Sequence, residues 1–399
     1  MSTGTGTIYR LIIKKIMSNK KIVLCGGGTG GHIYPSIAVS EVLQKEGCEL
    51  FYIGVNGKPE EKISEKYGIE FYGYDFSGFP RTLQKELLAW PFQLLNAVSK
   101  AKVYLKHFKP DIVFGTGGYS AAPVFIAARR LSIPYIVHNL DVRLGLANKF
   151  CANGAVLLTR GFEHDELHES NTPSIVTGNP VRKSFIEIEK TEKLKLYKEF
   201  NFSPDKKTVF IIGGSQGANA INETCLEIIK ELILTNNIQI IHQTGEATHE
   251  VFTKRIPVKV LESGMYIAKP FFDNPEVCYH LSDLVVSRSG AMTTTEIAIL
   301  GKPAIFIPFP FAGNHQEANV THLVNSGGAV LLKQKGLRSK VLLNTICDLI
   351  NSSGKLSEMS KITKSFAKPD AAVDLANLIL SKIKNNNEPI DKERLTSVI

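Results

Sequence analysis

The stretch Lys21-Ile-Val-Leu-Cys-Gly-Gly-Gly-Thr-Gly-Gly-His32 decides the fold of this chain, because an apolar run passes directly into a glycine-rich turn. The run predicts a buried strand, and the glycines that follow allow the backbone to turn sharply into a helix. A second stretch, Lys207-Thr-Val-Phe-Ile-Ile-Gly-Gly-Ser-Gln-Gly217, repeats the pattern 186 residues later. The repeat predicts two units of the same kind, each beginning with its own strand and glycine turn.

Short apolar runs alternate with helical patterns along the rest of the chain. The predicted strands lie at 22–24, 50–53, 112–114, 135–137 and 155–158, and then at 209–212, 238–241, 266–268, 284–286 and 304–307. Alternation of this kind is typical of a parallel sheet with helices on both faces. We therefore expect an α/β protein of two Rossmann-like domains.

The length of 399 residues exceeds that of one ordinary domain, which agrees with the repeat. The two domains are expected to meet near 180–190, after Gly178-Asn179-Pro180. The expected divisions are an extension at 1–19, with Met17 as an alternative start, a first domain at 20–183, a second at 184–365, a helix at 366–386 that packs back on the first domain, and a polar tail at 387–399.

Composition narrows the class of protein. Hydrophobic residues make up 43% and charged residues 21%, which excludes a disordered chain. The six cysteines are scattered without a C-x-x-C pair, which predicts buried free thiols and a reducing cytoplasm. No apolar run approaches the roughly 18 residues that span a bilayer. The net charge of +9 predicts an anionic partner: nucleic acid, a membrane surface or a phosphorylated substrate.

Much of the positive charge lies at residues 79–110, which contain six basic residues and one acid, Glu86. The basic side chains accompany apolar ones, and together they favour a helix at an anionic membrane surface. The predicted patch comprises Phe79, Arg81, Lys85, Leu87, Leu88, Trp90 and Phe92. The alternative is a core helix with a solvated basic face. A nucleic-acid partner is not expected, because no recognition module is visible.

The first glycine turn matches G-x-G-x-x-G, but the strand that follows ends Ile53-Gly54-Val55-Asn56 without the carboxylate of a dinucleotide site. His32 begins the next helix at the carboxyl edge of the first strand, where ligands bind in open α/β sheets. An imidazole there can accept a proton from a substrate hydroxyl. The alternative is a histidine that is hydrogen-bonded to the backbone.

Further polar residues follow strands of the second unit. Ser215 and the amides of its glycine turn suit a diphosphate. Glu296, one turn into a helix, can accept two bonds from a ribose diol or simply complement the helix dipole. Gln316 and Asn319 share a helical face, and as amides they suit sugar hydroxyls, although exposed polar residues explain them equally well.

Taken in order, these motifs resemble a known family. The set is Gly-Gly-Thr-Gly-Gly-His-x-x-Pro (27–35), Gly-Gly-Tyr (117–119), Gly-Asn-Pro-Val-Arg (178–182), Gly-Gly-Ser-Gln-Gly-Ala (213–218), His-Gln-Thr-Gly (242–245), Arg-Ser-Gly-Ala (288–291) and Gln316 with Asn319. It resembles the MurG family of N-acetylglucosaminyltransferases, which convert lipid I to lipid II in peptidoglycan synthesis. The resemblance covers residues 20–380.

The resemblance implies a GT-B architecture, in which donor and acceptor meet in a cleft between the domains, on the cytoplasmic face of the inner membrane. Its implied partners are UDP-GlcNAc, lipid I, the anionic membrane face and other cell-wall synthesis proteins. His32 would deprotonate the acceptor's 4-hydroxyl and give a β-1,4 link. The implied contacts are Thr29, Gly30 and Gly31 to sugar and acceptor; Arg182 and Ser215 to the diphosphate; backbone near Phe272 to uracil; Ala291, Met292, Thr293, Thr294, Thr295 and Glu296 to diphosphate and ribose; Gln316 and Asn319 to GlcNAc.

The chain departs from the family at 138–141, where it reads His-Asn-Leu-Asp instead of His-Glu-Gln-Asn. Asp141 stands where an amide normally assists substrate binding. The departure leaves a diacylglycerol glycosyltransferase as an alternative. A UDP-GlcNAc 2-epimerase, which shares the two-domain architecture, is another, and a noncatalytic scaffold is a third. No two aspartates are two positions apart, so the chain lacks a metal-binding Asp-x-Asp. We expect no cofactor, and no metal for donor binding.

Overall fold

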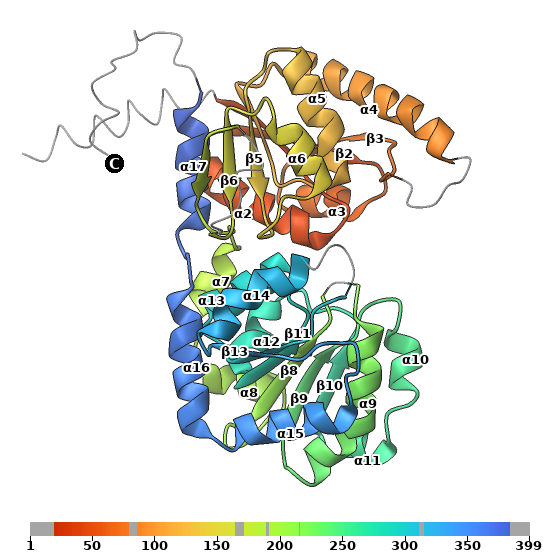
Figure 1. Ribbon diagram of the computed structural model, residues 1–399, viewed down its shortest axis with the longest axis vertical. Helices are drawn as coiled ribbons and strands as arrows, with labels where there is room; N and C mark the ends of the chain where they lie inside the picture. Colours follow the sequence, from red (N-terminus) through yellow and green to blue (C-terminus); the bar gives the residue numbers. More distant parts are fainter. Residues whose placement is uncertain are drawn as a thin grey trace, which may run out of the picture.

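The computed structural model describes residues 20–79, 86–163, 171–188, 191–214, 216–310 and 315–383. Each half of the chain forms one parallel sheet between layers of helices (Figure 1). The α/β class and the two Rossmann-like units predicted from the repeat are confirmed.

Within the described residues, the first sheet has seven strands in the order β3-β2-β1-β4-β5-β6-β7. They are β1 (Lys21–Cys25), β2 (Glu49–Val55), β3 (Glu70–Tyr74), β4 (Ile112–Gly115), β5 (Tyr135–Asn139), β6 (Leu157–Arg160) and β7 (Ser174–Val176). Its helices are α2 (Gly30–Lys45), α3 (Pro59–Lys66), α4 (Glu86–Phe108), η1 (Tyr119–Ala121), α5 (Ala122–Arg130) and α6 (Leu146–Ala152). Alternate residues of β1 enter separate cores on the two faces, as Ile22 and Val23 do.

The second sheet has six strands among the described residues, in the order β10-β9-β8-β11-β12-β13. They are β8 (Thr208–Ile212), β9 (Gln239–Gln243), β10 (Tyr266–Lys269), β11 (Leu284–Ser287), β12 (Ala304–Phe306) and β13 (Ala329–Leu331). Its helices are α7 (Lys183–Glu187), α8 (Lys193–Glu199), α9 (Asn219–Leu234), α10 (His249–Thr253), α11 (Val258–Glu262), α12 (Pro275–Leu281), α13 (Ala291–Ile299), α14 (His315–Asn325), α15 (Ser339–Ile350) and α16 (Ser353–Ser365). Val209 and Phe210 of β8 again enter opposite cores.

Three strands were absent from the prediction: β3, β7 and β13. All three lie at a sheet edge, where a strand has one neighbour and need not be buried on both faces. Their residues are accordingly part-exposed, as in β7, which contains no buried residue. β3 and β7 lack the continuous apolar run by which the inner strands are predicted, whereas β13 has a run at 329–332 that the prediction overlooked.

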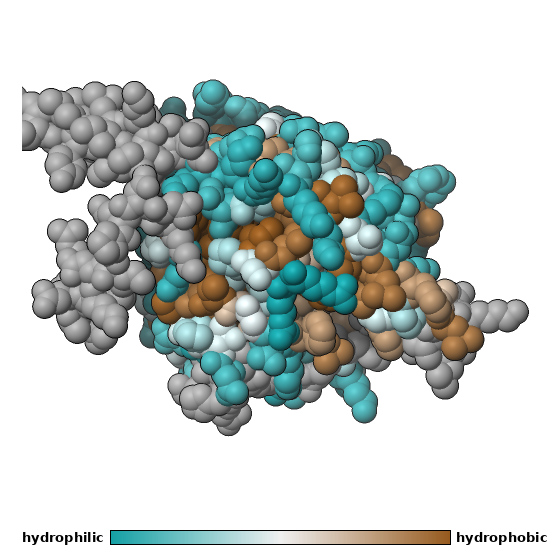
Figure 2. Space-filling view, turned by 90° about the horizontal axis from the view of Figure 1, so that it is seen from above, coloured by the Kyte–Doolittle hydropathy of each residue, from teal (hydrophilic) through white to brown (hydrophobic). Residues whose placement is uncertain are grey.

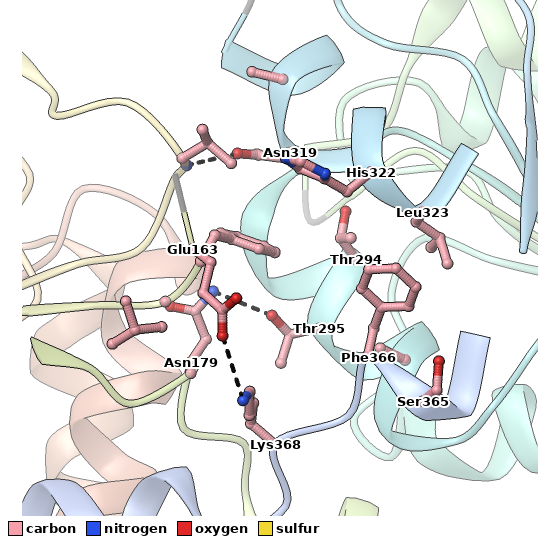
Figure 3. Close-up of a pocket in the computed structure, with 17 residues that line it drawn as sticks. Glu163, Asn179, Thr294, Thr295, Asn319, His322, Leu323, Ser365, Phe366 and Lys368 are labelled. Atoms are coloured by element: carbon pink, nitrogen blue, oxygen red, sulfur yellow. Dashed lines mark hydrogen bonds and ion pairs between the residues drawn. The ribbon is translucent and has the colours of Figure 1, made fainter. Parts of the chain in front are cut away.

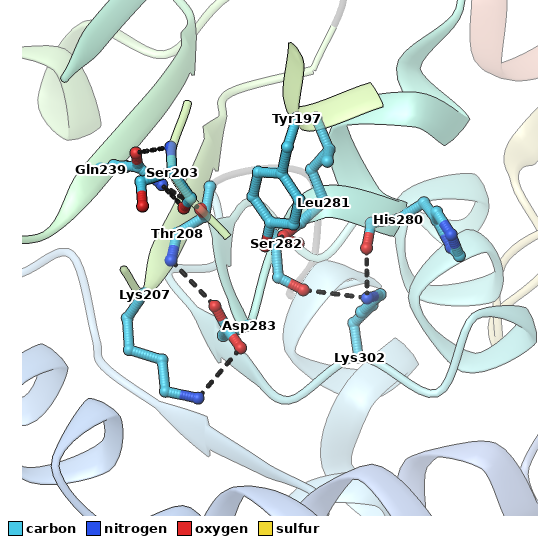
Figure 4. A network of polar contacts seen from close by, with 10 residues as sticks. All are labelled: Tyr197, Ser203, Lys207, Thr208, Gln239, His280, Leu281, Ser282, Asp283 and Lys302. Atoms are coloured by element: carbon cyan, nitrogen blue, oxygen red, sulfur yellow. Dashed lines mark hydrogen bonds and ion pairs between the residues drawn. The ribbon is translucent and has the colours of Figure 1, made fainter. Parts of the chain in front are cut away.

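A polar network holds the amino ends of β8 and β11 together, at the edge opposite the glycine turns (Figure 4). Asp283 accepts from the Thr208 N–H at 2.9 Å and from Lys207 Nζ at 3.2 Å. Lys302 Nζ donates to the carbonyls of His280 and Ser282, at 3.0 and 2.9 Å, at the end of α12. These contacts stabilise the scaffold on which the second glycine turn rests.

The chain crosses between the halves twice, before α7 and again after α16, and its last described helix, α17 (Ala371–Ser381), lies beside the first sheet (Figure 1). Leu375, Ala376 and Ile379 of α17 are buried in the core that contains Ile22 and Leu24. Among the helices of the described residues, none combines the length and apolar character needed to cross a membrane.

Candidate functional site

His32 lies in the first turn of α2, directly after the glycine turn that follows β1. Its Nδ1 is 3.0 Å from the carbonyl oxygen of Thr116, at the end of β4. A carbonyl only accepts hydrogen bonds, so we assign the ring proton to Nδ1 and leave a lone pair on Nε2. Both alternatives given for His32 in the sequence analysis therefore hold together: Nδ1 is hydrogen-bonded to the backbone, and Nε2 can act as a base.

Side chains of neighbouring elements hydrogen-bond to the buried side of the first glycine turn. Glu60 of α3 is fully buried and accepts from the N–H of Gly28 at 3.2 Å and of Val55 at 3.3 Å. The Tyr52 hydroxyl donates to the Gly26 carbonyl. On the outer side, Thr29 is exposed, and Gly30 and Gly31 are partly exposed at the start of α2. The turn thus has a rigid, buried side and an open side.

In the second half, Glu296 of α13 is partly buried beside α12. Its Oε2 accepts from the Tyr279 hydroxyl at 3.1 Å. Burial raises the pKa of Glu296 to about 7, against the opposing effect of the Arg182 charge. The carboxyl can therefore be either neutral or ionised near neutral pH.

Arg182 lies where the chain first crosses between the halves. Its Nη2 is 3.5 Å from Glu276 Oε2, and its guanidinium lies over the ring of Tyr34 from α2 at 4.5 Å. The side chain is buried against both halves, so it places a fixed positive charge at the seam.

Gln243 of β9 connects Phe272, whose backbone is predicted to contact uracil, with the second glycine turn. Gln243 Oε1 accepts from the Phe272 N–H at 3.1 Å, and Gln243 Nε2 donates to the Gly214 carbonyl at 3.2 Å. Gln243 thereby links the loop after β10 to the second glycine turn. Ser215, predicted to contact the diphosphate, lies outside the described residues.

Gln316 and Asn319 begin α14, as the helical pattern predicts. Gln316 Oε1 accepts from the Phe309 N–H at 2.9 Å. Asn319 is buried and crosses the seam: its Nδ2 donates to Asp141 Oδ1 at 2.8 Å and to the Ser289 carbonyl at 3.1 Å. In this arrangement, the side-chain amide of Asn319 serves the contact between the halves.

Comparison with known proteins identifies the family. The glycosyltransferase family 28 N-terminal domain matches residues 22–155, and the family's C-terminal domain matches residues 208–375. The chain is 38% identical to the UDP-N-acetylglucosamine–N-acetylmuramyl-(pentapeptide) pyrophosphoryl-undecaprenol N-acetylglucosamine transferase of Bacillus pumilus, over 90% of this chain and 98% of that one. The corresponding Bacillus subtilis transferase is 36% identical, also over 90% of this chain and 98% of that one.

The chain belongs to the MurG family, within glycosyltransferase family 28.

Solved structures agree with the GT-B architecture expected for this family. MurG of Acinetobacter baumannii superposes with a TM-score of 0.69 at 28% identity, covering 91% of this chain and 99% of that one. The UDP-GlcNAc 2-epimerase of Neisseria meningitidis shares the fold, with a TM-score of 0.66 at 16% identity, over 90% of this chain and all of that one.

The first turns of α13 divide between two environments. Ala291, Met292 and Thr293 open the helix, and Glu296 faces Tyr279. Thr294 and Thr295 instead line a cavity of about 410 Å³ between the halves (Figure 3). Thr295 accepts from Asn179 Nδ2 at 3.1 Å. The cavity is lined by residues of both chain crossings, so the side chains of these two threonines face the junction between the halves, whereas that of Glu296 faces Tyr279.

The predicted membrane patch lies on α4 and the segment before it. Phe79, Leu88 and Phe92 are 62%, 78% and 74% exposed. Trp90 differs from the expectation of an exposed anchor: it is half-buried, its ring lies 5.1 Å from that of Phe79, and its Nε1 donates to the Ser77 carbonyl at 3.2 Å. Figure 2 looks down on this half and shows apolar surface between polar side chains. The remaining members of the patch, Arg81, Lys85 and the side chain of Leu87, lie outside the described residues.

Four residues that hold the site were missed by sequence reasoning: Glu60, Thr116, Asn179 and Gln243. Asn179 and Gln243 lie within motifs that were noted, and Thr116 directly precedes the Gly-Gly-Tyr motif, but nothing local indicates which groups they contact. Glu60 carries no motif, since a glutamate in the first turn of a helix usually faces solvent.

Proposed function

We propose that this chain transfers GlcNAc from UDP-GlcNAc to the 4-hydroxyl of the MurNAc residue of lipid I, the undecaprenyl-diphosphate-linked MurNAc-pentapeptide, to give lipid II. The observation that carries the proposal is the match, over nine-tenths of the chain, to transferases that bear this activity in their names. The helix that carries His32 supports the same chemistry, because the ring of Tyr34 in α2 lies 4.5 Å from the guanidinium of Arg182 at the crossing between the halves.

The reaction is an inverting displacement. Nε2 of His32 accepts the proton of the acceptor hydroxyl as that oxygen forms a bond to the anomeric carbon of GlcNAc. The bond from this carbon to the diphosphate breaks, and its electron pair leaves with UDP. Attack occurs on the face opposite UDP, so the α-linked sugar of the donor becomes β-linked in the product.

The negative charge that develops on UDP needs fixed positive groups. We assign this role to Arg182, to Ser215 and to the N-terminal amides of α13 at Ala291–Thr293, because preorganised donors stabilise a leaving group without rearrangement. Glu296 would hold the ribose, the backbone of Phe272 the uracil, and Gln316 the sugar. Asn319 and Asp141 would act on the sugar through the contact that they make across the seam.

We further propose a peripheral location on the cytoplasmic face of the membrane, where lipid I is embedded. Exposed Phe79, Leu88 and Phe92 support this, because apolar side chains beside basic ones bind anionic lipid interfaces. Lys100 and Lys106 of α4 are exposed as well, and Lys102 is partly exposed. Roles in cell shape and division, and partnership with other cell-wall synthesis proteins, would follow from this location and product.

The test is incubation of the chain with UDP-GlcNAc alone, with lipid I, and with diacylglycerol. We expect UDP and lipid II only when lipid I is present. Release of UDP and N-acetylmannosamine without lipid would instead indicate an epimerase, and a glycosylated diacylglycerol would indicate the other transferase. H32A is expected to reduce turnover about 100-fold or more, the usual contribution of a general base.

A further inference from the structure

Thr116 contacts His32 at two points. Its carbonyl oxygen lies 3.0 Å from His32 Nδ1, and its hydroxyl donates to the carbonyl oxygen of His32. The Ser36 hydroxyl, one helical turn further along α2, lies 3.2 Å from the Thr116 hydroxyl. Thr116, at the end of β4, therefore contacts both the ring and the backbone of His32 on α2.

The position of Thr116 is itself determined by its surroundings. Its side chain is fully buried, and its N–H donates to the Cys25 carbonyl of β1 at 3.2 Å. Gly26 has a φ of 138°, and a Cβ there would collide with the Thr116 hydroxyl. The glycine of the motif thus provides space for the threonine, and the threonine occupies that space to reach α2.

The chain after Thr116 also shapes the space around the ring. Gly118 has a φ of 79°, and a Cβ placed there would collide with the Gly27 carbonyl oxygen at 2.7 Å and contact Cδ2 of His32 at 3.5 Å. The ring therefore lies between the β4 turn and the open side of the glycine turn. With Nδ1 held on the Thr116 carbonyl, a planar imidazole directs Nε2 away from β4.

We propose that Thr116 is a positioning residue, which selects the Nε2 lone-pair tautomer of His32 and aims that lone pair at the acceptor hydroxyl. The inference deepens the proposed function and rests on it. A histidine with only a solvent partner exchanges between tautomers, and only the tautomer protonated at Nδ1 can take a proton at Nε2. The hydrogen bond from the Thr116 hydroxyl matters because it holds Thr116 in place, and with it the Thr116 carbonyl that accepts from His32 Nδ1.

The test compares T116V and T116S with T363V in the full chain. Thr363 is a matched control: it is also fully buried, and its hydroxyl donates to a main-chain carbonyl, that of Gly328, at 2.8 Å in the second half. For T116V, we expect kcat to fall about 10- to 100-fold with little change in the KM for UDP-GlcNAc, because a base misplaced by about 1 Å loses a rate factor of this size. T116S should recover most of the rate, and T363V should lose stability without this fall in kcat.

A spectroscopic measurement separates positioning from general damage. In protein labelled with ¹⁵N-histidine, the His32 signals, assigned by their loss in H32Q, should show one protonated nitrogen, Nδ1, in the native chain and in T116S. In T116V, they should show mixed tautomers. If T116V matches T363V in kcat and keeps a single tautomer, the positioning role is overturned. If H32A itself turns over normally, the assignment of the base fails, whatever the behaviour of Thr116.

Discussion

Asn319 of α14 donates a hydrogen bond to Asp141, in the loop after β5, with 2.8 Å between Nδ2 and Oδ1. The same amide accepts from the Val142 N–H at 2.9 Å, so two consecutive residues of the first half are held by one residue of the second. Asp141 is also one of the three residues, 139–141, at which the chain departs from the usual His-Glu-Gln-Asn of its family. The departure therefore lies on the contact between the halves, beside residues assigned to the donor sugar.

N319D should reduce kcat/KM for UDP-GlcNAc by at least about tenfold, because it places two carboxylates in contact at a buried seam. D141N, which restores an amide, should retain most of the activity. The double variant D141N/N319D should recover part of the loss, since the exchanged amide and carboxylate can again share a hydrogen bond, while the bond to the Ser289 carbonyl stays broken. Initial rates of the native chain, the two single variants and the double variant give the coupling free energy between residues 141 and 319. If the losses in kcat/KM of the single variants add up to that of the double variant, the two residues are not coupled.

Donor affinity should depend on pH through Glu296, whose pKa is raised to about 7 by burial. The carboxylate that would accept the ribose hydroxyls is present above this pH and is lost below it. We expect the KM for UDP-GlcNAc to rise as pH falls from about 8 to about 6, and E296Q to show a higher KM that no longer changes with pH. Equal pH dependence in both proteins would exclude Glu296 as the source.

The raised pKa of Glu296 also affects the stability of the fold. Because the folded pKa of Glu296 lies above that of an unfolded glutamate, the folded state binds the extra proton between the two values, and stability falls as pH rises through that window. E296Q should therefore unfold at a higher temperature than the native chain at about pH 8, and lose this advantage at about pH 4.5. Thermal unfolding at the two pH values measures the difference.

Acid should destabilise the fold through His138, which is fully buried between Thr159 and Asn179. Burial lowers its pKa to about 4, below that of an unfolded histidine, so stability is present above about pH 6.5 and is lost progressively as pH falls toward 4. We expect H138Q to be less stable than the native chain at about pH 7.5. On acidification, the free energy of unfolding of H138Q should fall by less than that of the native chain, with a difference on the order of 1–3 kcal/mol. Urea unfolding at about pH 7.5 and about pH 5 checks this, with H107Q, at an exposed histidine of α4, as the control.

Membrane attachment should depend on the exposed apolar residues of α4. L88S/F92S should weaken flotation with vesicles that contain anionic lipid several-fold, because it removes apolar area from the predicted patch. V258S/L261S, at exposed positions of α11 in the other half, should bind as the native chain does. If both pairs behave alike, α4 is not the membrane surface.

The sequence by itself determined the features that depend on neighbours along the chain. Buried inner strands need continuous apolar runs, and sharp turns into helices need glycine, so both sheets and the place of His32 at the start of α2 could be predicted. The edge strands β3 and β7 could not, since a strand exposed on one side carries a weaker pattern.

Only the tertiary structure decided which groups surround each functional side chain. Thr116 is 84 residues from His32, and Asp141 is 178 residues from Asn319, and neither pair shares a local pattern. Which residues meet depends on the order of the strands and on how the two halves sit together. A hydrogen bond is satisfied by a group within about 3 Å in space, wherever that group lies in the chain.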